Sequence, residues 1–235
     1  MFGRNFNALK SSYTPSTYPL EENNVPILDP VTKANHLNDY FAGSRDPSLT
    51  GAPFRASIDF HCAQTTAAFN CAITEREICQ AISNAKNSSP GQDAITNIMI
   101  QHCSPNYLQE LHQLFNQSFL VGSVPRGWKS GTIIPIPKPL QPIVNKEGYR
   151  PITLLSCVGK TLERVLKCRL DHYLESNSLL SNAQFGFRPK KSVADVVASL
   201  TRDIQQALSS KQCCVVLYID LKGAFDSVWR HALLY

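Results

Sequence analysis

The sequence lacks several features that mark secreted, membrane-spanning and zinc-binding proteins. No apolar run follows a basic start, so we expect no secretory signal, and the apolar run 215–219 is far too short to cross a bilayer. None of the eight cysteines lies in a Cys-x-x-Cys pair, and no tight ligand spacing supports zinc at His61-Cys62 or His102-Cys103. No internal repeat is present. We therefore expect reduced thiols and an intracellular location, in the cytoplasm, the nucleus or both.

Positive charge is concentrated in one third of the chain. The net charge is +5, but residues 126–191 hold 12 Lys+Arg and 4 Asp+Glu, whereas residues 1–125 hold 7 and 10. The basic third also carries interleaved prolines and aromatic residues, among them Trp128, Tyr149, Phe185 and Phe187. Such a surface can stack bases and grip phosphates, which favours a nucleic-acid partner over a merely solvated lysine-rich surface.

Apolar periodicity predicts mostly helices with a few strands. Residues 1–25 have no periodicity and are expected to form a flexible lead-in, and 26–73 a linker with a short helix at 29–41. Thr74 and Glu77 predict a capping box at the start of the compact part. Further helices are expected after 95, from Ser104-Pro105, at about 157–174 and at 193–208, with a hairpin arm at 130–139 and a buried strand at 213–220. This is an α+β pattern.

The last apolar run ends on a carboxylate, Asp220, followed by Gly223, Phe225 and a second aspartate, Asp226. Asp and Gly are common turn residues, so a strand that simply ends in a turn is one interpretation. A carboxylate at a rigid strand end is also a way to hold a metal ion. The surrounding motifs decide between the two.

Five motifs occur in order: "SSPGQDAI" (88–95), "PRGWKSGTIIPIPKP" (125–139), "YRPITLLSCVGKTLERVL" (149–166), "QFGFRPKKSVAD" (184–195) and "LYIDLKGAFDSV" (217–228). Together they resemble the fingers and early palm of reverse transcriptases from non-LTR (LINE-type) retrotransposons, and "KANHLNDYF" (33–41) resembles the segment that leads into that domain. Any one motif would be weak evidence, whereas their joint order is specific. The resemblance implies a right-hand polymerase fold with fingers and a partial palm over residues 74–235.

The resemblance also implies roles for individual residues. Asp220 is the expected catalytic residue and, with the Leu221 carbonyl, a ligand for Mg²⁺; the runner-up for Asp220 is a turn aspartate, and Asp226 is expected to cap the next helix instead. Lys138 and Arg150 are expected to hold the nucleotide triphosphate, with Lys146 as an alternative to Lys138. Further roles concern Phe225, expected under the sugar of the nucleotide unless it is a core residue, and Gln184 and Arg188, expected on template or primer phosphates.

The implied activity is RNA-directed DNA synthesis: a primer 3′ hydroxyl is extended with deoxynucleotides on an RNA template by a two-metal mechanism. The sequence ends at Tyr235, fifteen residues after Asp220, so we expect this chain alone to lack polymerase activity and bind Mg²⁺ weakly. Gln92, Ala94 and Val193 depart from the family pattern at positions without chemistry. A non-catalytic nucleic-acid-binding remnant and a relative of intron maturases or telomerase are the alternatives.

Overall fold

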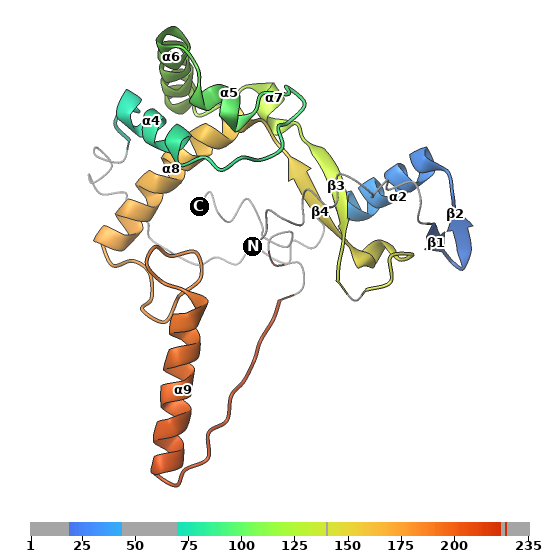
Figure 1. Cartoon of the computed structure of the whole chain (residues 1–235), viewed down its shortest axis with the longest axis vertical. Coiled ribbons are helices and arrows are strands. Elements are labelled where there is room, and N and C mark those ends of the chain that lie inside the picture. Colours follow the sequence, from blue (N-terminus) through green and yellow to red (C-terminus); the bar gives the residue numbers. More distant parts are fainter. Residues whose placement is uncertain (1–18, 44–69, 140, 222–223, 225–235) are drawn as a thin grey trace, which may run out of the picture. The chain divides into compact units, whose positions relative to one another are not determined.

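The computed structural model describes residues 19–43, 70–139, 141–221 and 224. It is a mixture of helix and strand, and it divides into two compact units that alternate along the chain. Among the described residues, the first unit holds 19–43, 130–139, 141–155 and 224, and the second holds 70–129 and 156–221. Figure 1 shows these elements in sequence colours. No helix in the described residues is both long and apolar enough to span a membrane.

The first unit begins with a small hairpin where the sequence indicated no regular structure. Strand β1 (Leu20–Glu22) pairs antiparallel with β2 (Val25–Ile27). The two residues between them, Asn23 and Asn24, have φ of 52° and 64°, and asparagine is one of the few residues that tolerates this left-handed region in a two-residue turn. The expected lead-in therefore contains ordered residues at its end.

Helix α2 (Pro30–Gly43) confirms the helix expected at 29–41. Asp29 caps its start, because one carboxylate oxygen accepts the backbone N–H and the hydroxyl of Thr32, each at 2.7 Å. These hydrogen bonds lower the pKa of Asp29. The helix buries Leu37 and Phe41 in a small core with Leu20 and Tyr149.

A second hairpin confirms the arm expected at 130–139. Strand β3 (Thr132–Pro137) pairs antiparallel with β4 (Tyr149–Leu154), and the 3₁₀ turn η2 (Lys146–Gly148) leads into β4. Figure 1 shows the two strands as a ribbon beside one another. Tyr149, at the start of β4, is buried, and its hydroxyl donates to the Ile143 carbonyl oxygen at 2.7 Å. The hairpin and the loop between its strands are thus tied to the α2 core.

The second unit is a helical cluster formed by α4 (Glu75–Ser83), α5 (Asn97–Gln101), α6 (Pro105–Val121), α7 (Arg126–Lys129) and α8 (Cys157–Ser176). Their apolar faces meet in one core, which includes Ile78, Phe115, Leu162 and Val165. The predicted capping box of Thr74 and Glu77 is confirmed, as is Pro105 at the first turn of α6. The sequence therefore located α4, α5, α6 and α8, whereas the single-turn helix α7 was not predicted.

Close packing of α7 on α8 depends on a glycine. Trp128 meets Phe115 edge-on, with 5.9 Å between ring centroids. A Cβ at Gly159 would lie 3.1 Å from two Trp128 side-chain carbons, which is tighter than ordinary contact. Gly159 therefore lets the first turn of α8 approach the indole.

The segment that enters α4 is fixed to α6 and α8 by side chains. The Asn116 amide accepts the Ile73 N–H at 2.7 Å and donates to the Ile73 carbonyl at 2.9 Å. Arg169 donates to both Glu77 carboxylate oxygens, at 2.6 and 2.9 Å, and to the Cys71 carbonyl at 2.7 Å. The hydrogen bond from Arg169, aided by those within the capping box, lowers the pKa of Glu77 to about 2.

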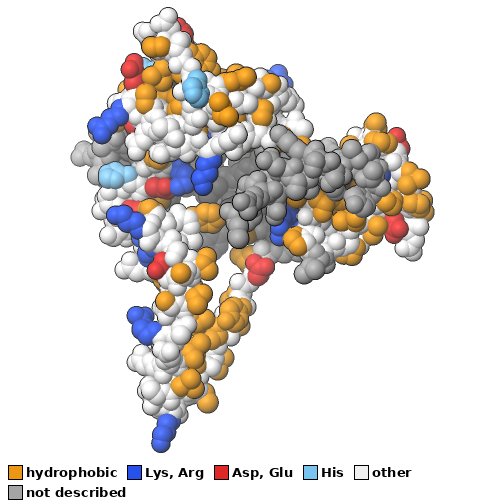
Figure 2. Space-filling view, in the orientation of Figure 1, with side chains coloured by type: hydrophobic (Ala, Val, Ile, Leu, Met, Phe, Trp, Pro, Cys, Tyr) orange, Lys and Arg blue, Asp and Glu red, His pale blue; other side chains and the backbone are white. Residues whose placement is uncertain are grey.

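The final described element is helix α9 (Val193–Ser209), which confirms the helix expected at 193–208. The strand expected at 213–220 is a wrong prediction, because residues 213–221 are extended but pair with no strand in the described chain, and they are exposed. Figure 2 shows hydrophobic side chains along α9 and this stretch. A buried strand requires neighbouring strands, and the apolar sequence alone does not supply them.

Candidate nucleotide and nucleic-acid sites

The β3–β4 hairpin presents two cations on one face. The register pairs Ile136 with Arg150, and the Lys138 N–H continues it by donating to the Gly148 carbonyl at 2.7 Å. Directly opposed residues share a face and alternate residues return to it, so Lys138 and Arg150 lie on the same face. Tyr149, one residue away, points to the other face and into the α2 core. The two residues expected to bind the triphosphate, Lys138 and Arg150, thus lie together on the face of the hairpin that does not pack into this core.

The structure also distinguishes between Lys138 and Lys146, the two candidate lysines for triphosphate binding. The Lys138 ammonium donates to the Glu147 carbonyl at 2.6 Å across the hairpin, on an exposed surface. Lys146 instead places its ammonium 5.5 Å from the Tyr40 ring centroid, on α2. Lys146 is therefore occupied on the side that packs against α2, which favours Lys138 as the partner of Arg150.

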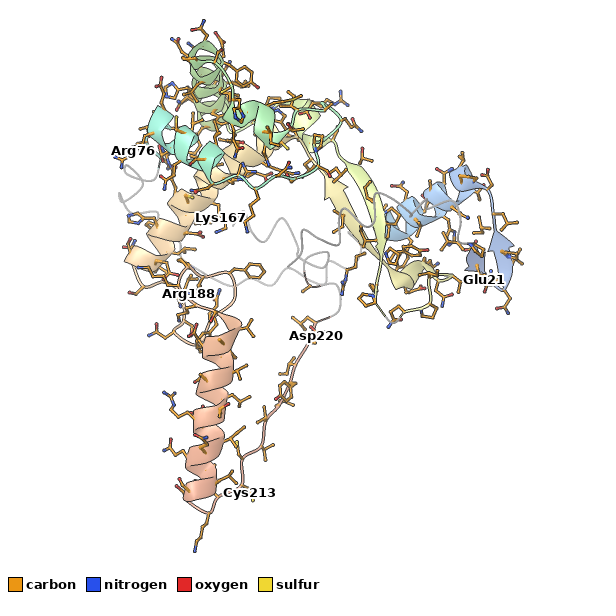
Figure 3. The ribbon with its side chains drawn as sticks, in the orientation of Figure 1. Glu21, Arg76, Lys167, Arg188, Cys213 and Asp220 are labelled. Carbon is orange, nitrogen blue, oxygen red and sulfur yellow. The ribbon has the colours of Figure 1, made fainter. Side chains whose placement is uncertain are left out.

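Asp220 lies at the end of the extended stretch that begins at Cys213 (Figure 3). Its side chain is exposed, and one carboxylate oxygen accepts the Leu221 N–H at 3.0 Å. Its oxygen atoms are the donor type that Mg²⁺ prefers. Among the described residues no three His, Cys, Asp or Glu side chains gather into a metal-binding group, so Asp220 supplies a single carboxylate. This donor set fits part of a magnesium site.

The loop between α8 and α9 is organised by Arg188, which Figure 3 labels below the end of α8. Its Nε and Nη2 donate to the two oxygens of Glu175 at 2.8 and 2.6 Å, and its Nη1 donates to the Ser181 carbonyl at 2.7 Å. The bidentate contact lowers the pKa of Glu175 and raises that of Arg188. Gln184 is exposed in the same loop, and its amide donates to the Gly186 carbonyl at 3.4 Å.

Two contributors to this loop were missed from the sequence. Glu175 holds the Arg188 guanidinium, and Lys191 donates to the Asn182 carbonyl at 2.8 Å while lying 4.9 Å from the Phe185 ring centroid. A usable signal was present, because no acidic residue occurs between Glu175 and Asp195. Glu175 is therefore the nearest preceding acid for a cation in this stretch.

The remaining expected site residues lie outside the described part of the chain. These are Phe225 and Asp226. Lys138 and Arg150 belong to the first compact unit, whereas Gln184, Arg188 and Asp220 belong to the second.

Comparison with known proteins identifies relatives of this chain. Residues 136–235 match the family model described as reverse transcriptase (RNA-dependent DNA polymerase). The chain is 35% identical over 163 residues to the probable RNA-directed DNA polymerase from transposon BS of Drosophila melanogaster, covering 69% of this chain and 18% of the relative. It is 32% identical over 165 residues to the RNA-directed DNA polymerase from mobile element jockey of the same species, covering 70% and 18%.

A third relative is the Pol polyprotein from the type-1 retrotransposable element R1 of Bradysia coprophila, 32% identical over 161 residues, with 67% of this chain and 16% of the relative covered. The chain thus spans less than a fifth of the length of these curated relatives. The matched region contains both the cationic hairpin face and the Asp220 segment. The chain belongs to the reverse transcriptase family, whose domain model matches residues 136–235, and its relatives are encoded by non-LTR retrotransposons.

Proposed function

We propose that this chain contributes the fingers and the first part of the palm to an RNA-directed DNA polymerase of a non-LTR retrotransposon. That polymerase extends the 3′ hydroxyl of a DNA primer with deoxynucleotides on an RNA template, inside the cell. The observation that carries the proposal is the family match over 136–235, which includes Asp220 and the paired cations of the hairpin.

The hairpin residues bind the incoming nucleotide. Arg150 offers a planar fork for two phosphate oxygens, and Lys138 offers a compact charge on the same face. Triphosphate binding exchanges the bond from Lys138 to the exposed Glu147 carbonyl for a charge-assisted contact. Because Tyr149 anchors the opposite face, the two cations stand on a fixed support.

Asp220 and the Leu221 carbonyl are the proposed protein ligands for Mg²⁺. Held by these oxygen atoms, the metal would supply positive charge that neutralises the phosphates of the nucleotide. The Leu221 N–H donates to Asp220 and limits the directions that the carboxylate can take. Phe225 is proposed to lie under the deoxyribose, where a ribose 2′ hydroxyl would clash.

The α8–α9 loop is proposed to follow the template or primer backbone. Gln184 is exposed and able to contact phosphate or sugar directly. The Arg188 side chain is only 8% exposed and shares its charge with Glu175, so its proposed contribution is to hold the loop in register for that contact.

A domain replacement tests the proposed activity. In a chimera, residues 136–235 of this chain replace the matching segment of the jockey polymerase. Deoxynucleotide incorporation is then measured on an RNA template with a DNA primer. The account expects template-dependent extension by the folded chimera. A folded chimera without incorporation, beside an active parental jockey polymerase, would contradict it and favour a non-catalytic nucleic-acid-binding remnant.

A further inference from the structure

Phe187 combines a disfavoured backbone conformation with an exposed aromatic side chain. Its φ is 60°, in the left-handed region that glycine and asparagine adopt far more readily than an aromatic residue. Its side chain gains no burial in return, because the residue is 89% exposed. The preceding residue, Gly186, is better suited to the left-handed region, yet Phe187 is the residue that adopts it. Exposure of an aromatic ring on a disfavoured backbone is typical of functional positions.

The loop around Phe187 is preorganised. Arg188, the next residue, is held by both oxygens of Glu175 on α8 and by the Ser181 carbonyl. From the far side of the loop, Lys191 donates to the Asn182 and Gln184 carbonyls, at 2.8 and 3.3 Å. The Phe187 backbone is therefore fixed on both sides, so a ligand that meets the ring there encounters a surface that is already ordered.

Charge indicates which partner fits this ring. Residues 176–194 contain no Asp or Glu but include Arg188, Lys190 and Lys191. Lys190 is exposed, and in the described part of the chain it takes part in none of the ion pairs. An exposed aromatic ring beside cations is the arrangement by which proteins stack a base and attract the neighbouring phosphate. The three cations of this stretch suit phosphates, so a nucleic-acid strand is the partner that matches both the ring and the charge.

We propose that Phe187 is a stacking platform for an unpaired base of single-stranded RNA or DNA, with Lys190 meeting an adjacent phosphate. This inference rests on the proposed function, since it names a contact between the polymerase and its unpaired template. It goes further because it assigns a contact with a base to Phe187. Its neighbours Gln184 and Arg188 were expected to contact only the phosphates of the template or primer. Stacking is sequence-tolerant, because every base has a π-face.

The test compares two ligands on the 235-residue chain. Binding is measured by fluorescence anisotropy with a labelled twelve-nucleotide RNA and with an abasic oligomer of equal phosphate number. The wild type is expected to prefer the base-bearing ligand by about tenfold, and Phe187→Ala to lose most of that preference while Phe187→Trp keeps it. The slope of log affinity against log salt concentration should stay unchanged in Phe187→Ala, because no cation is removed. In Lys190→Gln the steepness of this slope should fall by about 0.7.

A stability measurement separates stacking from a structural role. Phe187→Gly removes the ring and relieves the backbone, so its urea midpoint is expected to equal or exceed that of the wild type while RNA binding falls. A lower midpoint with unchanged binding would show that the ring serves the fold and overturn the proposal. Equal RNA affinity of wild type and Phe187→Ala would overturn it but leave the polymerase assignment intact. Failure of the wild type to bind any oligomer would contradict both.

Discussion

One aromatic side chain, Phe225, is proposed to set how the polymerase distinguishes deoxyribose from ribose. Phe225 follows Asp220 by five residues, at the position proposed to lie under the deoxyribose. In the jockey chimera, Phe225→Val is expected to raise ribonucleotide incorporation by about tenfold or more, because the smaller side chain leaves room for a 2′ hydroxyl. Phe225→Tyr serves as the control that keeps the bulk. Discrimination that survives Phe225→Val would show that Phe225 does not exclude the hydroxyl.

The Glu77–Arg169 pair makes stability depend on pH in the acid range. The pKa of Glu77 is lowered from 4.5 to about 2, mainly by the hydrogen bond from Arg169. The folded state thus holds the proton less tightly than the unfolded chain, so the stabilisation is present above pH 4.5 and is lost as pH falls towards about 2.

Urea unfolding at several pH values tests this coupling. Glu77→Gln is expected to have a lower midpoint than the wild type at pH 7 and a flatter dependence of the midpoint between about pH 4.5 and 2. Glu75→Gln, at an exposed position two residues away, is the matched control. If both variants kept the wild-type slope, the ion pair would not be the cause.

Side-chain pairs such as Glu77–Arg169 could be predicted from the sequence only where the two partners are close together in the chain. The Thr74–Glu77 capping box has a fixed spacing of three residues, and the sequence predicted it. Arg169 and Glu77 are 92 residues apart, and Arg188 and Glu175 are 13 apart across a loop. Neither spacing has a regular geometry, so the fold was needed to assign these pairs, although the lack of acids between Glu175 and Asp195 narrowed the candidates for Arg188. The role of Arg188 in holding its own loop was missed for this reason.

Prolines protect the edges of the β3–β4 hairpin. Pro135 lies opposite Pro151, and within the described residues β3 and β4 pair only with each other. Neither proline can donate a ladder hydrogen bond, so this pair must be of the non-hydrogen-bonded type, whose backbone nitrogens face outward. Each proline therefore removes an outward donor from an exposed edge, which limits strand addition by another chain.

Restoring those donors is expected to promote self-association. The double variant Pro135→Thr/Pro151→Thr should show more oligomer than the wild type in sedimentation velocity at equal concentration. Pro139→Thr, beyond the end of β3, is the control and should leave the distribution unchanged. A monomer fraction equal in all three proteins would contradict the protective role of the prolines.

Helices were easier to predict than strands for a physical reason. The 3.6-residue apolar period of a helix can be read within one contiguous segment, without knowledge of its packing partners. Helices α8 and α9 both show this period, and both lie close to their expected bounds. A strand depends on partners elsewhere in the chain. The run 213–220 has the composition of a central strand, yet its side chains from Val215 to Leu221 are exposed. The β1–β2 hairpin escaped notice because strands of three residues are too short to show alternation.

The basic third of the sequence is shared by both compact units. Of its residues, 130–155 belong to the first unit, whereas 126–129 and 156–191 belong to the second. A phosphate-rich ligand is expected to bind this third in a salt-sensitive way, because each neutralised phosphate releases counterions.

Filter binding of an RNA–DNA duplex to the 235-residue chain measures this dependence. The logarithm of the affinity is expected to fall linearly with the logarithm of salt concentration. An uncharged peptide nucleic acid of the same sequence, which keeps the bases and lacks phosphates, should bind weakly with no slope. No affinity for the duplex at low salt, or an affinity that salt leaves unchanged, would contradict the nucleic-acid assignment.

The central claim is that Asp220 is the carboxylate on which nucleotide transfer depends, and single-nucleotide incorporation by the jockey chimera tests it most directly. Asp220→Asn keeps the side-chain shape and removes the charge, so the account predicts a loss of incorporation of about a thousandfold or more at every Mg²⁺ concentration, with template–primer affinity within threefold of the wild type. Asp203→Asn, on the exposed surface of α9, is the control and should remain active. Incorporation by Asp220→Asn at a rate close to that of the wild type would contradict the account.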